Sequence, residues 1–327
     1  GLLLVIGAVA IHTLSPLLVH VFSSARELGT VAPAWFGLML LLEVGSFAAA
    51  WGLTRLAVPG LTWGVAAMAQ LAANGASRVF PGGAVVGTGL YYSMLARSGI
   101  EAGQAAAALT TNSLISTMVL FALPAVAAGI AVFSVPLPAG LVPVAIGGLV
   151  VFAALLVAGF LTIRFDAPLR WATRGIGAVA GWVAALRHRT VKVSARTVLE
   201  RRDKIVKVLG PNWYKATALA ATNWLLDYLV LVVALRAVGA NPRLSIVLLA
   251  YAAAAVLSMI PITPGGLGFV EAGLTATLAA AGVPAGSALL ATLGYRLIGF
   301  WLPIPAGGIS YLVFRRKYGK PVEAAEG

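Results

Sequence analysis

Long apolar segments constrain this chain more than any other feature of its sequence. Six of them are long enough to cross the hydrocarbon core of a bilayer, which takes about 20 residues of helix. They are the segments 2–22, 33–56, 104–133, 138–163, 213–238 and 286–314. The composition agrees, because only 10% of the 327 residues are charged, against roughly 25% in soluble domains. The sequence therefore predicts an all-α polytopic membrane protein with a single transmembrane domain over residues 1–327, and it excludes a soluble enzyme and a nucleic-acid partner.

Two further apolar regions are each interrupted by a stretch rich in proline and glycine. Region 61–98 is broken around Pro81-Gly82-Gly83, and region 243–282 is broken around Pro264-Gly265-Gly266. Each break leaves two half-length helices on either side of a tip. Irregular backbone at membrane depth is tolerated where protein buries it or where it lines a cavity. We therefore predict a re-entrant helical hairpin in each region, with two kinked full spans as the alternative.

The two broken regions repeat each other at a constant offset of 183 residues. Within 81–103, 8 of the 23 positions are identical to the position 183 residues later, without a gap. Three full spans separate the starts of the two regions, and an odd number of crossings places them on opposite faces of the membrane. The sequence thus predicts inverted repeats centred on 61–133 and 243–314, an arrangement typical of transporters.

The basic residues predict the orientation in the membrane. Placing the loop 165–212 in the cytoplasm puts 18 of the 23 basic residues on that side, 3 on the opposite side and 2 within the membrane. Positively charged loops stay cytoplasmic, so we predict that both termini are cytoplasmic. The loop also carries apolar residues at helical spacing between arginines, which predicts an amphipathic helix on the anionic inner leaflet. An ordinary basic linker is the alternative.

Five ionisable side chains fall inside apolar segments, where each costs at least about 2.5–3.5 kcal/mol at the centre of a span. They are Glu43, Arg78, Asp227, Glu271 and Arg296. Arg78 lies three residues before the first tip, where its planar guanidinium could meet a phosphate; a structural ion pair with Glu43 or Asp227 is the alternative. Glu271 follows the second tip, where a helix N-terminus favours a carboxylate. We predict that Glu271 pairs with Arg296, either as a static clamp or as a contact that opens during transport.

Other polar residues extend this candidate translocation site. Asn223 and Asp227 are four residues apart and share one helix face, and Asn74, Asn112 and Tyr295 are further candidates for a polar path. A half-helix that starts after each tip would direct free N–H groups toward a phosphate or carboxylate, unless the breaks only serve packing. The residues that we expect to bind or pass the substrate are Arg78, Pro81, Gly82, Gly83, Pro264, Gly265, Gly266, Glu271, Arg296, Glu43, Asn223 and Asp227.

No pattern in the sequence points to catalysis or to a cofactor. There is no cysteine, and the three histidines (His12, His20 and His188) have no metal-ligand spacing. No phosphate-binding loop or catalytic triad is present on a polar stretch. We therefore expect no enzymatic activity, no metal and no cofactor.

The stretch from Pro261 to Glu271, followed by Gly282-Val283, Arg296 and Gly307-Gly308, resembles a known family. It is similar to the flippase-like transmembrane domain of bacterial lysylphosphatidylglycerol synthases (multiple peptide resistance factor) and their stand-alone relatives. In that family a Glu follows the Pro-Gly-Gly-x-Gly tip and an Arg lies in the next span, which here are Glu271 and Arg296. The resemblance covers most of the chain. It implies re-entrant helices and movement of a lipid between the leaflets of a bacterial plasma membrane.

Two departures from that family limit what the resemblance implies. Its full-length synthases carry a soluble aminoacyl-transferase domain, which no stretch of these 327 residues could house, so we expect no lysyl transfer. The first repeat lacks the acidic residue and the Arg that many relatives place just after the tip. The lipid is therefore left open among aminoacylated phospholipids, glycolipids and polyprenyl-linked sugars.

The sequence thus predicts a flippase for an anionic or phosphate-linked lipid. The alternatives are an ion-coupled carrier of a small anionic solute and a non-transporting scaffold for an envelope-lipid enzyme. The expected partners are membrane lipids with anionic headgroups; a second copy of the chain and an envelope-lipid synthase are the candidate protein partners. A cavity open sideways to lipid would favour the flippase, and a sealed water-filled vestibule would favour the carrier.

Overall fold

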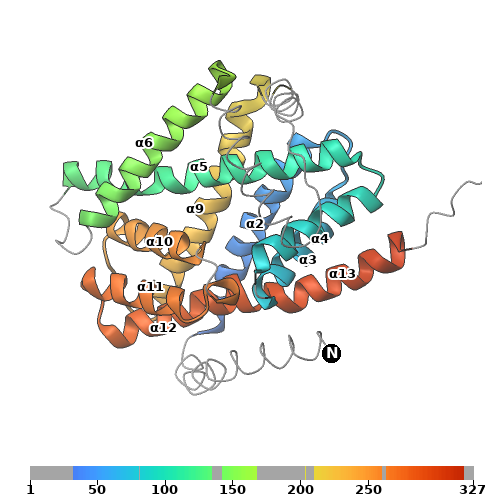
Figure 1. Ribbon diagram of the computed structural model, residues 1–327. Coiled ribbons are helices and arrows are strands. Elements are labelled where there is room, and N and C mark those ends of the chain that lie inside the picture. Colours follow the sequence, from blue (N-terminus) through green and yellow to red (C-terminus); the bar gives the residue numbers. More distant parts are fainter. Residues whose placement is uncertain are drawn as a thin grey trace, which may run out of the picture.

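The computed structural model describes residues 32–80, 82–134, 142–167, 203, 210–259 and 263–319. All regular structure in these ranges is helical, in agreement with the predicted all-α class (Figure 1). The predicted span 2–22 lies outside the described residues, as do nearly all of the loop 165–212 and the end of the chain beyond residue 319.

Among the described residues, four helical stretches are long and apolar enough to cross a membrane. They are Pro33–Ala57 (α2), Ala102–Ala127 within α5 (Ala102–Ser134), Gly210–Ala237 with α9 (Trp213–Ala237), and Ala285–Tyr318. The last consists of α12 (Ala285–Arg296), a π-helical turn η4 (Leu297–Trp301) and α13 (Pro303–Tyr318). These four agree with predicted spans. The predicted span 138–163 corresponds to helix α6 (Val142–Arg164), which contains a shorter apolar helical stretch, Leu149–Gly159.

Both broken regions form pairs of short helices, and the breaks fall where the sequence predicts them. The first hairpin consists of α3 (Trp63–Val79) and α4 (Gly83–Arg97), and the second of α10 (Leu244–Ser258), a 3-10 turn η3 (Pro264–Gly266) and α11 (Phe269–Ala280). In each hairpin the two helices pack against each other. Gly82, Gly265 and Gly266 have φ values of +69°, +59° and +71°. This left-handed backbone ends a helix and is easily adopted only by glycine.

The offset of 183 residues also relates the helices of the two halves. Shifted by 183, α3 would span 246–262, α4 266–280 and α5 285–317, close to α10, α11 and the run from α12 to α13. Figure 1 shows α5 crossing the molecule from right to left and the run from α12 to α13 crossing it from left to right. The repeat in the sequence therefore extends to the order and the lengths of the helices.

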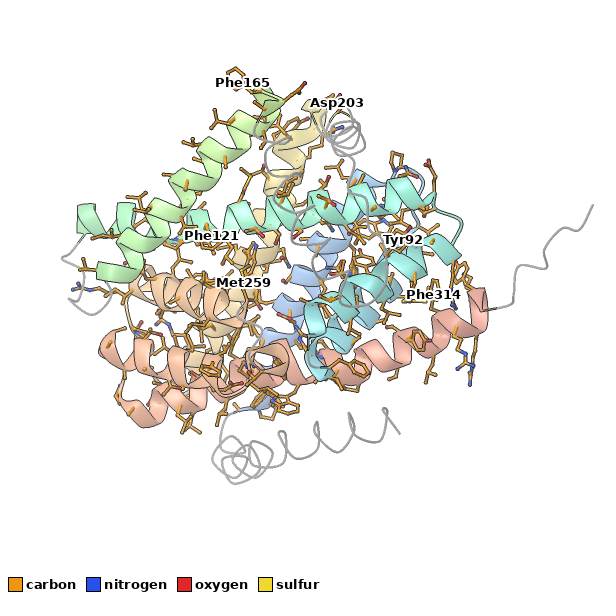
Figure 2. All side chains as sticks on the ribbon, in the orientation of Figure 1. Tyr92, Phe121, Phe165, Asp203, Met259 and Phe314 are labelled. Atoms are coloured by element: carbon orange, nitrogen blue, oxygen red, sulfur yellow. The ribbon has the colours of Figure 1, made fainter. Side chains whose placement is uncertain are left out.

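Among the described residues, the two larger apolar cores follow this division, and a third, smaller one lies between α2 and α9 around Leu53, Ala216 and Ala220. One of the two larger cores lies among α9, α10, α11 and α12 and includes the fully buried Leu231, Leu249 and Leu274. The other lies among α3, α4 and the start of α5, and Phe314 of α13, labelled in Figure 2, completes it. Helices α2 and α9 pack closely between these cores, because Gly45 and Gly52 leave room for leucines of α9. Small residues allow this close approach between helices in membranes.

The outward faces of the helices carry large apolar side chains. Leu41 of α2, Val85 of α4 and Ile309 of α13 are 68%, 79% and 63% exposed, and similar residues lie on α5, α6 and α9. A soluble monomer rarely exposes so much contiguous apolar surface. These faces are therefore suited to contact with lipid, as expected of a membrane protein.

Candidate translocation site

A cavity of about 320 Å³ lies where the breaks of the two hairpins meet. At this junction, a Cβ placed on Gly265 of the second hairpin would lie 3.5 Å from the Cα of Arg78 in the first. Six of the twelve predicted site residues line the cavity, which we call the charged chamber. They are Glu43, Arg78, Asn223, Asp227, Gly265 and Arg296.

Of the other six predicted residues, Gly82, Gly83, Gly266 and Glu271 are described, and none of these four lines the chamber. Glu271 lies behind Arg296, and Gly266 packs against the end of α10. Gly83 lies directly on α3, since a Cβ there would be 1.7 Å from the Ser77 carbonyl oxygen. Gly82 forms the N-cap of α4. Pro81 lies outside the described residues, and for Pro264 only the backbone is described.

The second tip is closed by an ion pair between Glu271 and Arg296. Arg296 Nε lies 2.6 Å from Glu271 Oε1, and Arg296 Nη2 donates to the Gly265 carbonyl at 3.2 Å. Glu271 Oε2 accepts a hydrogen bond of 2.7 Å from the N–H of Gly268, the N-cap of α11. Both charged residues are buried, at 8% and 7% exposure. The predicted pair is confirmed. The Glu271 carboxylate also accepts a hydrogen bond from a backbone N–H group at the start of α11, so this N–H group already has a partner within the protein.

At the first tip, Arg78 lies within electrostatic reach of Glu43 and Asp227 but is not in contact with either. Its Nη1 atom is buried and makes no hydrogen bond, and the described carboxylates form no ion pair with it. The alternative of a structural ion pair with Glu43 or Asp227 is therefore not observed. Instead, Arg78 and Arg296 both lie over the ring of Phe300, with their guanidinium carbons 5.5 Å and 4.0 Å from its centroid. This cation–π geometry holds two like charges on one aromatic ring.

The acidic groups of the chamber converge near Gly299, in the π-helical turn. A Cβ on Gly299 would lie 3.7 Å from Asp227 Oδ1 and 3.9 Å from Glu43 Oε1. Asp227 Oδ2 accepts hydrogen bonds from the hydroxyl groups of Tyr251 at 2.5 Å and Tyr295 at 2.9 Å. Glu43 Oε2 is buried and makes no hydrogen bond. Of the charged side chains that line this chamber, Arg78 and Glu43 therefore keep unsatisfied polar atoms.

Asn223 joins α9 to α2 at the edge of the same chamber. Its Nδ2 donates to the backbone carbonyl of Ser46 at 3.0 Å and to the Ser46 hydroxyl at 2.7 Å. The Ser46 hydroxyl in turn donates to the backbone carbonyl of Asn223 at 3.0 Å. The predicted shared face of Asn223 and Asp227 is confirmed, because both line the charged chamber.

A second cavity of about 370 Å³ adjoins the first. We call it the neutral chamber, because none of the described residues that line it is charged. Its polar lining residues are Gln70, Asn74, Ser77, Thr88, Tyr91, Asn112, Ser113, Ser116 and Asn223. Four of them, Gln70, Asn74, Ser77 and Asn223, also line the charged chamber. The predicted polar-path residues Asn74, Asn112 and Tyr295 thus all lie at one chamber or the other.

Sequence reasoning missed Phe300, Tyr251 and Gln70. Phe300 is four residues after Arg296, and that spacing favours contact between a cation and an aromatic side chain on a helix. Nothing in the spacing of Tyr251 relates it to Asp227, because the two lie on different helices. Within the described residues no group of three or more His, Cys, Asp and Glu could hold a metal ion.

Comparison of the sequence with curated proteins finds no match. Comparison with protein families finds one that covers residues 2–307, described as the lysylphosphatidylglycerol synthase TM region. The match includes both hairpins and every residue of the two chambers. By this match, the chain belongs to the family of lysylphosphatidylglycerol synthase transmembrane regions.

Proposed function

We propose that this protein is a flippase that moves an anionic, phosphate-bearing lipid between the leaflets of a bacterial plasma membrane, without catalysing a reaction. The observation that carries the proposal is the buried Nη1 atom of Arg78, which makes no hydrogen bond in the charged chamber. An ionisable side chain inside a membrane protein is costly and usually functional, and a buried donor without an acceptor adds to that cost. A phosphate that passes through the chamber would supply the partner that the protein itself does not provide.

The other charges of the chamber support an anion at Arg78. Arg296 is satisfied by Glu271, and Asp227 is satisfied by two tyrosine hydroxyls. Among the described residues that line the chamber, Arg78 is thus the basic residue with a hydrogen-bond donor that has no acceptor. The planar guanidinium of an Arg matches the geometry of a phosphate. The acyl chains would stay in the bilayer along the apolar outer faces while the headgroup crosses the interior.

The proposed placement in the membrane rests on helix length and on the repeat. The four hairpin helices have 17, 15, 15 and 12 residues, all shorter than the roughly 20 residues of a full span. We therefore place α3–α4 and α10–α11 as re-entrant hairpins that enter from opposite faces. With the basic loop 165–212 in the cytoplasm, both termini are cytoplasmic and the two tips meet near the midplane.

Leaflet-resolved transport in reconstituted vesicles tests this proposal. A fluorescent phosphatidic acid whose label is reduced only in the outer leaflet should exchange between leaflets when the wild-type protein is present. Arg78→Ala should slow this exchange at least tenfold, whereas Arg97→Ala, an exposed Arg at the end of α4, should leave it unchanged. Wild-type vesicles that move none of several phosphate-bearing lipids but accumulate inorganic phosphate would refute the flippase and favour the anion carrier.

A further inference from the structure

The neutral chamber offers hydroxyl and amide groups beside a chamber that offers charges. The two share Gln70, Asn74 and Ser77 of α3 and Asn223 of α9 as a common wall. If the phosphate of a lipid lies at Arg78, the part of the headgroup beyond the phosphate would therefore lie against this wall. The lining of the neutral chamber indicates the chemistry of that extension.

Two buried acceptor atoms in the neutral chamber make no hydrogen bond with the described protein. They are Gln70 Oε1 and Asn112 Oδ1. A buried polar atom without a partner is costly, so such atoms indicate a ligand or water that donates to them. Hydroxyl groups are donors of this kind.

Asn112 is held so that its carbonyl oxygen stays available. Its Nδ2 donates to Thr54 Oγ1 at 2.7 Å, and Thr54 Oγ1 is also 2.8 Å from the hydroxyl of Tyr91. Thr54 and Tyr91 are buried, at 0% and 8% exposure. This network fixes the amide nitrogen toward α2 and leaves the oxygen as the unused group. Hydroxyls of Thr88, Ser113 and Ser116 complete the lining.

The absence of charge from this lining separates two kinds of headgroup extension. Within the neutral chamber a cationic aminoacyl group would lie among neutral groups, because the carboxylates Glu43 and Asp227 line the charged chamber instead. A buried charge without a counter-charge is strongly unfavourable. A sugar or polyol carries many hydroxyl donors and acceptors and no charge. It matches the amides, hydroxyls and the tyrosine that line the neutral chamber.

We infer that the neutral chamber binds the uncharged, hydroxyl-rich part of the lipid headgroup. The substrate is then a phosphate-linked lipid with a sugar or polyol beyond the phosphate, and not one with a cationic aminoacyl group. This inference rests on the proposed flippase function, because it assumes that the phosphate lies at Arg78.

The test compares three fluorescent lipids in vesicles that contain the full chain. Phosphatidylinositol carries a hydroxylated ring beyond its phosphate, phosphatidic acid has no extension, and lysylphosphatidylglycerol has a cationic one. Wild-type protein should move phosphatidylinositol at least threefold faster than lysylphosphatidylglycerol. Asn112→Leu should slow phosphatidylinositol about threefold to tenfold, roughly the effect of one lost hydrogen bond, and should leave phosphatidic acid within about twofold.

A second variant guards against a folding defect, because Asn112→Leu also removes the hydrogen bond to Thr54. Thr88→Val removes one lining hydroxyl without changing side-chain shape, and it should slow phosphatidylinositol selectively. Thr110→Val, an exposed position on α5 that lines neither chamber, is the matched control. Faster movement of the lysyl lipid, or equal effects of the variants on all three lipids, would overturn the inference while the flippase proposal stood. Failure of wild-type protein to move any of the three would count against the flippase proposal itself.

Discussion

The two hairpins share a Pro-Gly-Gly break and similar helix lengths, but their tips are chemically different. At the second tip, Glu271 binds Arg296 and caps α11, so each charge has a partner. At the first tip, Arg78 forms no ion pair with a described carboxylate and its buried Nη1 atom makes no hydrogen bond, and α3 and α4 border the neutral chamber. The comparison indicates that the charged groups of the second tip stabilise the structure. The first tip provides polar groups without hydrogen-bond partners, which a substrate would bind.

The largest expected difference between the two tips should appear when one partner of the Glu271–Arg296 ion pair is removed. Glu271→Gln and Arg296→Gln should each lower the free energy of unfolding in detergent by about 3–5 kcal/mol, because each leaves a buried charge alone. The double variant should lose less than the sum of the two, since it leaves neither charge. Strictly additive losses would show that the two side chains do not act as a pair.

Glycine substitutions compare the backbones of the two tips. Gly265→Ala should cost about 2–4 kcal/mol in unfolding, because φ is +59° and the new Cβ would lie 2.3 Å from a Phe300 ring atom. Gly82→Ala meets no atom within 4 Å at φ +69°, so it should cost only the backbone strain of about 1–2 kcal/mol. Equal costs at the two positions would contradict the tighter packing assigned to the second tip.

A smaller effect should appear where one aromatic ring connects the tips. Phe300→Leu and Arg78→Gln should be coupled by about 0.5–1 kcal/mol in a double-mutant cycle of unfolding, because the Arg78 guanidinium lies over the ring. Phe314→Leu is the control, since Phe314 packs in the core of the first hairpin against Tyr318 and contacts neither Arg. Coupling of Arg78 to Phe314 as large as its coupling to Phe300 would argue against a specific contact.

The sequence predicted those parts of the fold and the site that follow from the free-energy cost of placing a given residue in a membrane. An apolar helix needs a membrane, proline and glycine break it, and a charge buried at Glu271 needs a partner such as Arg296. The arrangement of the chambers could not be predicted in the same way. The contact of Tyr251 with Asp227, the placement of Phe300 over two arginines and the unused oxygen of Asn112 depend on how helices cross. Sequence spacing within one helix carries no information about that.

The most direct measurement of the central claim, that Arg78 is an open site for phosphate, is the binding of short-chain phosphatidic acid to the purified protein in detergent. Wild-type protein and the Arg97→Gln control should bind it with the same affinity, and Arg78→Gln should bind at least tenfold more weakly. Its stability should fall by no more than about 1 kcal/mol, from the lost contact with Phe300, because the buried Nη1 atom makes no hydrogen bond in the protein. If Arg78→Gln bound the lipid as tightly as wild type, the first tip would not be the phosphate site and the account would be wrong.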